Sequence, residues 1–181
     1  MKICSDVDGV ILNYTQGFID FTKKEKIPYY HNPELYGVIS NFPDNQKVRE
    51  QFYSGKYLSK LNFYQNSLEI LNLLASNHEL HLVSALEPKQ SKKRAENLKM
   101  LNYATLQCVG DDRKEEVVIE EIQPEVMIED RPELIVAFHR AGIRVIFPDW
   151  HPYTKGMERI ATPFSIWNEV PHLLQNTLAT E

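Results

Sequence analysis

The sequence is poor in cysteine. Cys4 and Cys108 are the only two in 181 residues, and neither has a Cys-x-x-Cys partner or a histidine at zinc-finger spacing. This usage argues against a disulfide scaffold or a zinc module and favours buried free thiols in a reducing compartment. A chain of this length buries about 70% of the surface that it exposes when unfolded, so its core needs no covalent or metal cross-link.

Long hydrophobic runs and an excess of positive charge are also missing. No stretch of about 18 apolar residues occurs that could cross a membrane, and Asp6 comes too early for the apolar region of a signal peptide. Lysine and arginine number 20 against 25 aspartates and glutamates, a formal net charge of −5. We therefore expect a cytoplasmic protein with no membrane partner and no nucleic acid polymer as partner. A small anionic ligand stays compatible with this charge, because a local site can be positive.

Short apolar runs alternate with segments of helical periodicity along most of the chain. The predicted strands cover residues 2–6, 78–83, 105–109, 125–128, 143–147 and, at an edge, 164–166. The predicted helices of this alternation cover 67–76, 89–101, 113–122, 132–141 and 168–178. Strands separated by helices of about ten residues imply right-handed crossovers. They predict an α/β, Rossmann-like fold, with a mostly parallel sheet flanked by helices on both faces.

One region interrupts the alternation after the first strand. A helix with Phe18 and Phe21 at helical spacing is predicted over 14–26 and ends near Pro28. From 29 to 63 the sequence is rich in tyrosine, has scattered proline and glycine, and shows only short helical patterns such as 44–53. We assign 14–63 to a small helical cap, inserted into a catalytic core made of 1–13 and 64–181.

Polar side chains stand at the carboxyl ends of the predicted strands. Ligands of parallel α/β sheets bind beyond these ends, at the point where the strand order reverses. Groups of complementary type that converge there from distant segments are a stronger signal than any one of them. In chain order they are Asp6 and Asp8; Ser84; Asp111, Asp112 and Lys114; Glu129 and Asp130.

The spacing Asp6-x-Asp8 indicates a cation site. Residues i and i+2 of an extended strand point to the same side, so both carboxylates can approach one ligand. Two carboxylates in one place repel each other unless they share a proton or a divalent cation. With Glu129 or Asp130 added, the oxygen-only ligands suit Mg²⁺, which usually also binds substrate phosphate. Lys114 and a hydroxyl after the second strand could then bind the phosphoryl oxygens.

These residues also have ordinary structural interpretations. Asp8-Gly9 can form a turn, and Ser84 can cap the helix that follows it. Glu129-Asp130 precedes a proline and can cap the next helix. Their convergence on one predicted edge favours the chemical interpretation.

The ordered motifs resemble those of the haloacid dehalogenase superfamily of phosphohydrolases. The resemblance rests on Asp-Val-Asp-Gly-Val at 6–10, Leu-Val-Ser-Ala at 82–85, a downstream lysine, and Ile-Glu-Asp-Arg-Pro at 128–132. Within the superfamily, the chain looks most like the small-cap 5′-nucleotidase and 5′(3′)-deoxyribonucleotidase branch. The cues are the helical insertion, the Ile-Glu-Asp-Arg-Pro-Glu form of the fourth motif, and Asp-Trp-His-Pro-Tyr at 149–153.

The resemblance implies a role for each motif. Asp6 would be the nucleophile that forms an aspartyl-phosphate, and Asp8 the general acid that protonates the leaving alcohol and then activates water. Ser84 would bind the transferring phosphoryl group, and Lys114 would offset its negative charge. Mg²⁺ would be held at Asp6, at the backbone carbonyl of Asp8 and at an acid of the fourth motif.

The chain departs from the pattern of that branch at several positions. Glu129 stands where the branch usually has aspartate, which leaves open whether Glu129 or Asp130 binds the metal. Ser84 replaces the commoner threonine but keeps the hydroxyl. The lysine is ambiguous as well, because Lys93, early in the helix after the second motif, competes with Lys114. Lys92 competes with it in the same way, and Thr154 stands where the branch has asparagine.

Residues of the cap and of the second motif are candidates for substrate binding. We single out Ser84, Ala85, Lys93, Phe18 and Tyr57. Aromatic faces accept any nucleobase, yet aromatic residues more often form the core of a small subdomain. That second interpretation applies equally to the other cap aromatics, which are Tyr29, Tyr30, Tyr36, Phe52 and Tyr53.

We expect a Mg²⁺-dependent phosphomonoesterase, acting on a nucleoside monophosphate as monomer or homodimer. The alternatives are a phosphatase of the same fold for another small phosphate ester, and a binding module that keeps the fold without turnover. A phosphorylatable signalling receiver also uses acids, a hydroxyl and a lysine on a parallel sheet. Its phosphoacceptor lies after a later strand and it has no cap-sized insertion, so the receiver fits this sequence poorly.

Overall fold

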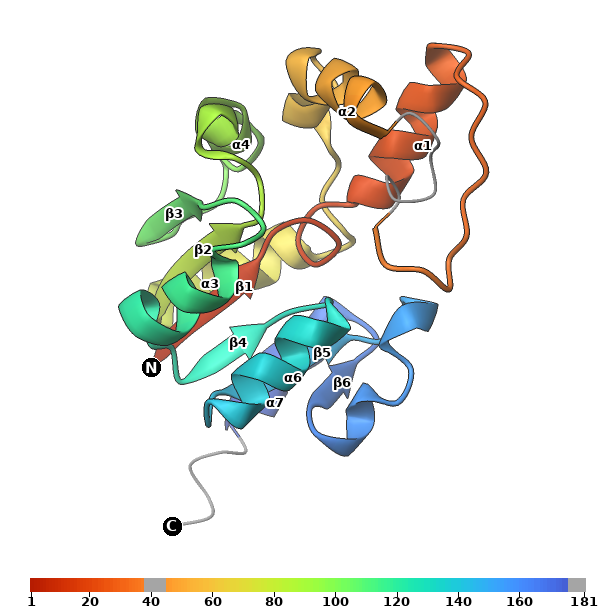
Figure 1. The fold of residues 1–181 in the computed structure, drawn as a ribbon. Coiled ribbons are helices and arrows are strands. Elements are labelled where there is room, and N and C mark those ends of the chain that lie inside the picture. The colour runs from red at the N-terminus through yellow and green to blue at the C-terminus, as the bar shows by residue number, and fades with distance from the viewer. Residues whose placement is uncertain (38–44, 176–181) are drawn as a thin grey trace.

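The computed structural model describes residues 1–37 and 45–175, and its centre is a six-stranded sheet (Figure 1). The strand order is β3-β2-β1-β4-β5-β6, and all neighbouring strands run parallel. This confirms the predicted α/β class with a parallel sheet. The strands are β1 Lys2–Asp6, β2 Glu79–Ser84, β3 Thr105–Cys108, β4 Val126–Ile128, β5 Arg144–Pro148 and β6 Thr162–Phe164.

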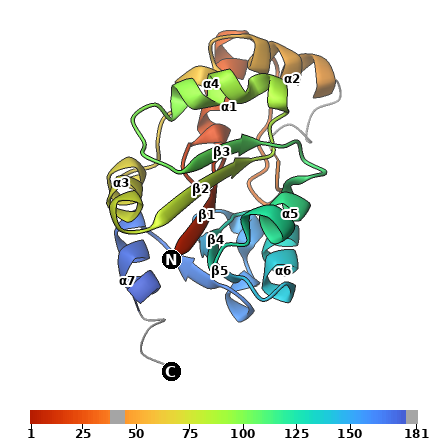
Figure 2. The same cartoon turned by 90° about the vertical axis from the view of Figure 1, so that its left-hand side faces the viewer.

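Helices cover both faces of the sheet. Figure 2 shows α3 and α7 on one side of the strands and α5 and α6 on the other. Within the described ranges, no helix is both long enough and apolar enough to traverse a bilayer. The helices are α1 Tyr14–Lys24, α2 Asn45–Ser54, α3 Ser67–Asn77, α4 Ser91–Asn97, α5 Lys114–Glu116, α6 Pro132–Arg140 and α7 Val170–Gln175.

Successive strand residues bury two apolar clusters on opposite faces of the sheet. Ile3 and Ile146 belong to the cluster that includes apolar residues of α3 and α7. Cys4 and Val145, one position along each strand, belong to the cluster that includes those of α6. A parallel sheet needs such strands, apolar on both sides, because helices cover both faces. Cys4 and Cys108 are buried free thiols, as the sequence predicts.

The helical segment after β1 forms the cap over the core (Figure 1). The chain leaves the core and returns to it at one place, because the Asn13 backbone N–H donates to the Asn62 carbonyl across 2.8 Å. Phe18, Phe21 and Phe52 are fully buried, and the Phe52 ring centroid lies 5.3 Å from that of Phe18 and 5.2 Å from that of Phe21. These aromatics are the core of the cap. Residues 38–44 of the expected cap lie outside the described residues.

Several element boundaries differ from the expected ones. The helix expected over 113–122 consists of the single turn α5 followed by a π-helical segment, Val117–Ile122. The helix expected over 89–101 begins with a 3₁₀ turn, and its α-helical part ends at Asn97. The edge strand expected at 164–166 is β6, Thr162–Phe164, which begins and ends two residues earlier; beyond its end the Ser165 N–H bonds the Glu169 carboxylate. Of the last expected helix, residues 176–178 lie outside the described residues.

Candidate active site

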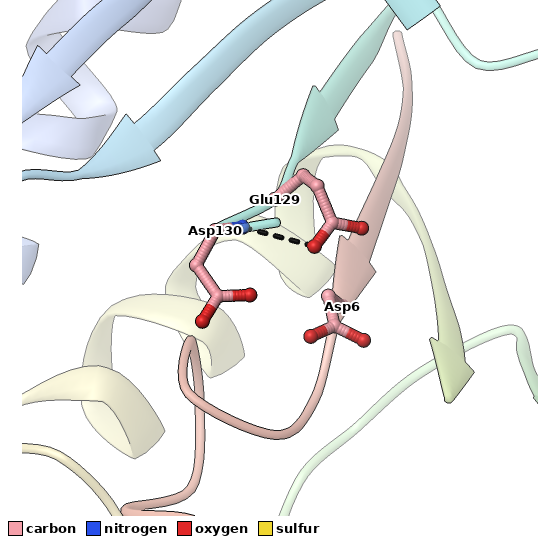
Figure 3. A group of neighbouring side chains, drawn as sticks. All are labelled: Asp6, Glu129 and Asp130. Carbon is pink, nitrogen blue, oxygen red and sulfur yellow. Dashed lines mark hydrogen bonds between the residues drawn. The ribbon is translucent and has the colours of Figure 1, made fainter. Parts of the chain in front are cut away.

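The sheet register brings the predicted polar residues to one edge. Asp6, the last residue of β1, lies opposite Val83 of β2, so Ser84 comes one position beyond it. On the other side Ser5 lies opposite Ile128 of β4, so Glu129 follows directly. Figure 3 shows Asp6 at the end of β1 facing the pair of acids that follows β4. β1 is therefore the central strand of the site.

Three buried carboxylates and one ammonium form the centre of the site. One carboxylate oxygen from each of Asp6, Glu129 and Asp130 lies within 4.8 Å of the other two. The Lys114 ammonium lies 2.5 Å from Asp6 Oδ1 and 2.7 Å from Glu129 Oε2. All four side chains are buried. One positive charge cannot neutralise three ionised carboxylates, so the group calls for a further cation or for protons.

The charges in this cluster shift each other's pKa. Burial raises the pKa of Asp6 to about 7, against the opposing effect of the Lys114 ammonium, and the Glu129 carboxylate adds to the rise. Burial, with the neighbouring Asp6 and Glu129 carboxylates, raises the pKa of Asp130 well above its usual range. Burial alone would lower the pKa of Lys114, but its two carboxylate partners outweigh that and raise it. Lys114 thus stays protonated, whereas a divalent ion would stabilise the ionised form of the acids.

The carboxylate oxygens of Glu129 and Asp130 differ in how free they are to bind a metal ion. Glu129 Oε1 accepts the backbone N–H groups of Asp130 and Arg131, each at 3.0 Å, and Oε2 pairs with Lys114. Asp130 Oδ2 accepts the Tyr153 hydroxyl at 2.6 Å. Asp130 Oδ1 is buried and has no hydrogen-bond partner among the described residues. An orphaned carboxylate oxygen beside Asp6 fits a hard cation such as Mg²⁺.

The Asp8 carboxylate is held in place by Arg94 and Ser84. Nη2 of Arg94 lies 2.6 Å from Oδ1 and 2.7 Å from Oδ2 of Asp8, and the Ser84 hydroxyl donates to Oδ2 at 3.3 Å. Ser84 Oγ also accepts the Leu86 backbone N–H, so it caps the turn after β2 as well. Arg94 is fully buried in α4, whereas the Asp8 side chain keeps 22% of its exposure. The Asp8 carboxylate therefore faces the solvent side of the site with an arginine behind it.

Gly9 lets the loop after β1 approach the acids. Its φ is +86°, and a Cβ atom there would lie 2.2 Å from Asp130 Oδ2. Only glycine fits such a position. The Gly9 carbonyl lies 2.8 Å from Nε2 of His151, and the His151 ring stacks on that of Tyr153 at 4.7 Å. Burial lowers the pKa of His151 to about 4 and keeps this imidazole neutral.

A pocket of about 230 Å³ opens between this edge and the cap. Asp8 and Asp130 line it, and Asp6, only 3% exposed, lies buried next to them. The walls carry aromatic rings and one cation, Arg49 of α2. Its other lining residues are Gly9, Tyr14, Thr15, His31, Leu35, Tyr36, Gly37, Tyr53, Ala85, Leu86, Asp111 and Tyr153.

The structure brings most of the predicted site residues together but separates three of them. Phe18 is fully buried in the cap core. Tyr57 lines a separate cavity of about 290 Å³ and donates its hydroxyl to Glu25. Lys93 donates to three backbone carbonyls at the end of α2. The residues at or beside the pocket are Asp6, Asp8, Ser84, Ala85, Lys114, Glu129 and Asp130.

Sequence reasoning missed Arg94. It lies in a charged segment, Ser-Lys-Lys-Arg, that is typical of a solvated helix. The periodicity gives a partial signal, because Arg94 occupies the same helical face as the buried Leu98, four residues on. Tyr153 belongs to the motif at 149–153, but its bond to Asp130 depends on the path of the loop after β5, which the motif does not predict.

The fold places the chain in a known structural class. A haloacid dehalogenase-like family hydrolase from Streptococcus pneumoniae matches over 96% of this chain and 97% of that one, with 14% identity and a TM-score of 0.75. A protein from Thermotoga maritima named as a putative β-phosphoglucomutase gives 18% identity and a TM-score of 0.66, over 97% of this chain and 99% of that one. The protein has the haloacid dehalogenase fold, as its motifs predict.

A further solved structure of the same fold contains a metal. It is a protein from Bacillus subtilis named as a putative haloacid dehalogenase hydrolase and bound to magnesium, with 14% identity, a TM-score of 0.64, and coverage of 96% of this chain and 97% of that one. No family model matches the sequence, and no curated protein matches it either. These likenesses define the fold, and they give no specific support to the nucleotidase branch.

Proposed function

We propose that this protein is a Mg²⁺-dependent phosphomonoesterase that acts through an aspartyl-phosphate on Asp6. The observation that carries the proposal is the cluster of Asp6, Glu129 and Asp130 around Lys114, with Asp130 Oδ1 left unbonded in the described part of the chain. The magnesium-bound hydrolase of the same fold is consistent with it. Mg²⁺ held by Asp6 and Asp130 would supply positive charge to the phosphoryl oxygens as the transfer proceeds.

The side chains divide the reaction between them. An Asp6 oxygen attacks phosphorus, and the bond from phosphorus to the ester oxygen breaks while Asp8 gives that oxygen a proton. Asp8 then takes a proton from water, whose oxygen attacks the aspartyl-phosphate, and the products are inorganic phosphate and the free Asp6 carboxylate. Lys114 and the Ser84 hydroxyl stabilise the phosphoryl charge. Glu129, whose Oε1 accepts two backbone N–H groups and whose Oε2 forms an ion pair with Lys114, positions Lys114.

The pocket favours a small ester as substrate. Its volume of about 230 Å³ is below the roughly 300 Å³ at which ligand pockets for drug-sized molecules begin. Nucleoside monophosphates stay within the proposal, because tyrosines at 14, 36, 53 and 153 line the pocket and aromatic faces stack on bases. Sugar phosphates and short carboxylic acid phosphates are the other classes. A folded binding module without turnover is the alternative to all of them.

The test measures phosphate release from a panel of substrates with Mg²⁺ or with EDTA. The panel contains nucleoside and deoxynucleoside monophosphates, sugar phosphates, phosphoglycolate and p-nitrophenyl phosphate. Mg²⁺-dependent release that is lost in Asp6→Asn supports the proposal, and the ranking of substrates identifies the class. If folded wild-type protein binds Mg²⁺ and releases phosphate from none of these esters, the proposal is wrong and the binding module is favoured.

A further inference from the structure

The strongest feature outside the predicted motifs is a buried arginine behind Asp8. The Arg94 side chain is fully inaccessible to solvent, and its Nη2 lies 2.6 Å and 2.7 Å from the two Asp8 oxygens. Its Nε and Nη1 atoms are buried and have no hydrogen-bond partner in the described ranges. A guanidinium is charged at any accessible pH. Burying it with two unbonded donors is costly, and an apolar side chain of similar size would be cheaper for stability alone.

The contact constrains the position of Asp8. One nitrogen reaches both carboxylate oxygens, and Ser84 Oγ donates to one of them at 3.3 Å. Asp8 precedes Gly9, whose positive φ makes the following loop turn sharply. Without a fixed partner, the side chain could rotate toward solvent, since 22% of it is exposed. The arginine, rigid in a buried helix position, holds the carboxylate on the pocket wall.

We infer that Arg94 is a positioning residue for Asp8, which keeps that carboxylate in place for its proton transfers. The inference rests on the proposed function, in which Asp8 gives and takes protons during phosphoryl transfer. Arg94 does not line the pocket, so it acts through Asp8 and not on the substrate. Displacing a reacting group by about 1 Å costs on the order of 100-fold in rate. Loss of Arg94 should therefore lower kcat strongly and leave KM nearly unchanged.

The test is a double-mutant cycle between Asp8 and Arg94. The variants are Asp8→Asn, Arg94→Met and the two combined, assayed with p-nitrophenyl phosphate and Mg²⁺. Nitrophenolate leaves without a proton, so with this substrate the loss of Asp8 slows only the hydrolysis of the aspartyl-phosphate, and the slow release that remains in Asp8→Asn is followed at high enzyme concentration. We expect Arg94→Met to reduce kcat about 100-fold in the wild-type background and less than about threefold in Asp8→Asn. A purely structural role would give the same factor in both backgrounds, and that result would overturn the inference.

Further variants separate folding from positioning. Arg140→Met removes an exposed arginine of α6 and should keep wild-type kcat. Arg94→Lys keeps the charge and should recover part of kcat; it also replaces Arg94→Met in the cycle if the methionine variant does not fold. A rise in KM at constant kcat would show that Arg94 binds substrate and would contradict the inference. If the wild-type protein releases no product from any ester, the proposed function itself is overturned. If the wild-type protein is active and Arg94→Met has the same kcat, only the role of Arg94 is overturned.

Discussion

Gly9 has little freedom to change. Its φ of +86° disfavours any side chain, and a Cβ would meet Asp130 Oδ2 at 2.2 Å. We expect Gly9→Ala to lower the free energy of unfolding by about 2–4 kcal/mol, because backbone strain and a buried clash add. Denaturant unfolding measures this loss. Mg²⁺ affinity should also fall, since Asp130 has to move.

Gly142→Ala is the matched control for that substitution. Gly142 has a similar φ of +81°, but a Cβ there would meet nothing within 4 Å beyond its own chain neighbours. Its cost should be the strain alone, roughly 1–2 kcal/mol. An equal loss in the free energy of unfolding at the two positions would show that the Asp130 side chain moves aside without penalty. That result would argue against a rigid acid cluster.

Tyr153 is expected to tune the metal site through Asp130. Its hydroxyl donates to Asp130 Oδ2 at 2.6 Å and so orients Oδ1. Groups that orient a metal ligand typically contribute about 10- to 100-fold to metal affinity. We expect Tyr153→Phe to weaken Mg²⁺ binding by about 10-fold or more, measured by calorimetric titration. Tyr30→Phe, at a tyrosine that is 83% exposed, is the control and should leave the affinity unchanged.

At the scale of elements, the cap and core meet at α4. Lys93 of α4 donates to the Ser54 carbonyl at 2.7 Å and to the Gly55 carbonyl at 3.3 Å, and also to that of Tyr53. The last carbonyls of a helix have no partners within it, so an ammonium there stabilises the end of α2. Arg94, the next residue, contacts Asp8. Helix α4 thus links the end of the cap to the proposed proton-transfer residue.

Removing this lysine should loosen α2. Charge-assisted hydrogen bonds contribute about 1.5–3 kcal/mol, so in Lys93→Met we expect amide hydrogen exchange in α2 to rise at least about 10-fold. The amides of the sheet should be unaffected. Lys92→Met, at an exposed position of the same helix, is the control. Unchanged exchange in α2 would mean that the aromatic core of the cap holds it without Lys93.

The sequence predicted elements better than their ends. Short apolar runs between segments of helical periodicity located all six strands. Strands that are buried on both faces leave this strong pattern because nearly all their residues are apolar. The exact ends at Asn97 and Phe164 lie beside local hydrogen bonds that periodicity does not report, such as that from Ser165 to Glu169. Likewise Asp6 and Glu129 were placed at one edge from strand ends alone, whereas Arg94 required knowledge of how α4 packs.

For the whole molecule, the cluster of buried acids links stability to pH. Asp6 has a pKa of about 7 in the folded protein without metal, far above the usual value for aspartate. Between about pH 4 and about pH 7 the folded state therefore binds more protons than the unfolded state, and stability should fall as the pH rises through this window. Asp130, whose pKa is also raised, acts in the same direction. Mg²⁺ binds the ionised acids and should reverse this loss.

Thermal unfolding with and without Mg²⁺ tests this linkage. We expect Mg²⁺ to raise Tm by several degrees at about pH 8 and by much less at about pH 5, where protons compete for the carboxylates. In Asp130→Asn the Mg²⁺-dependent rise at high pH should largely disappear. A rise of equal size at both pH values would indicate that the ion binds elsewhere.

The position of β1 has a consequence for the order of synthesis. It is the central strand of the site, yet its two neighbours are β2, which begins at Glu79, and β4, which begins at Val126. During translation the N-terminal segment that carries Asp6 and Asp8 emerges first, and the first partner strand for it appears only after the whole cap has been made. Parallel pairing of such distant segments is slow and leaves apolar surface open meanwhile. The loop that carries Asp6 and Asp8 is thus synthesised before the rest of the candidate site and is among the last of its parts to acquire its neighbours.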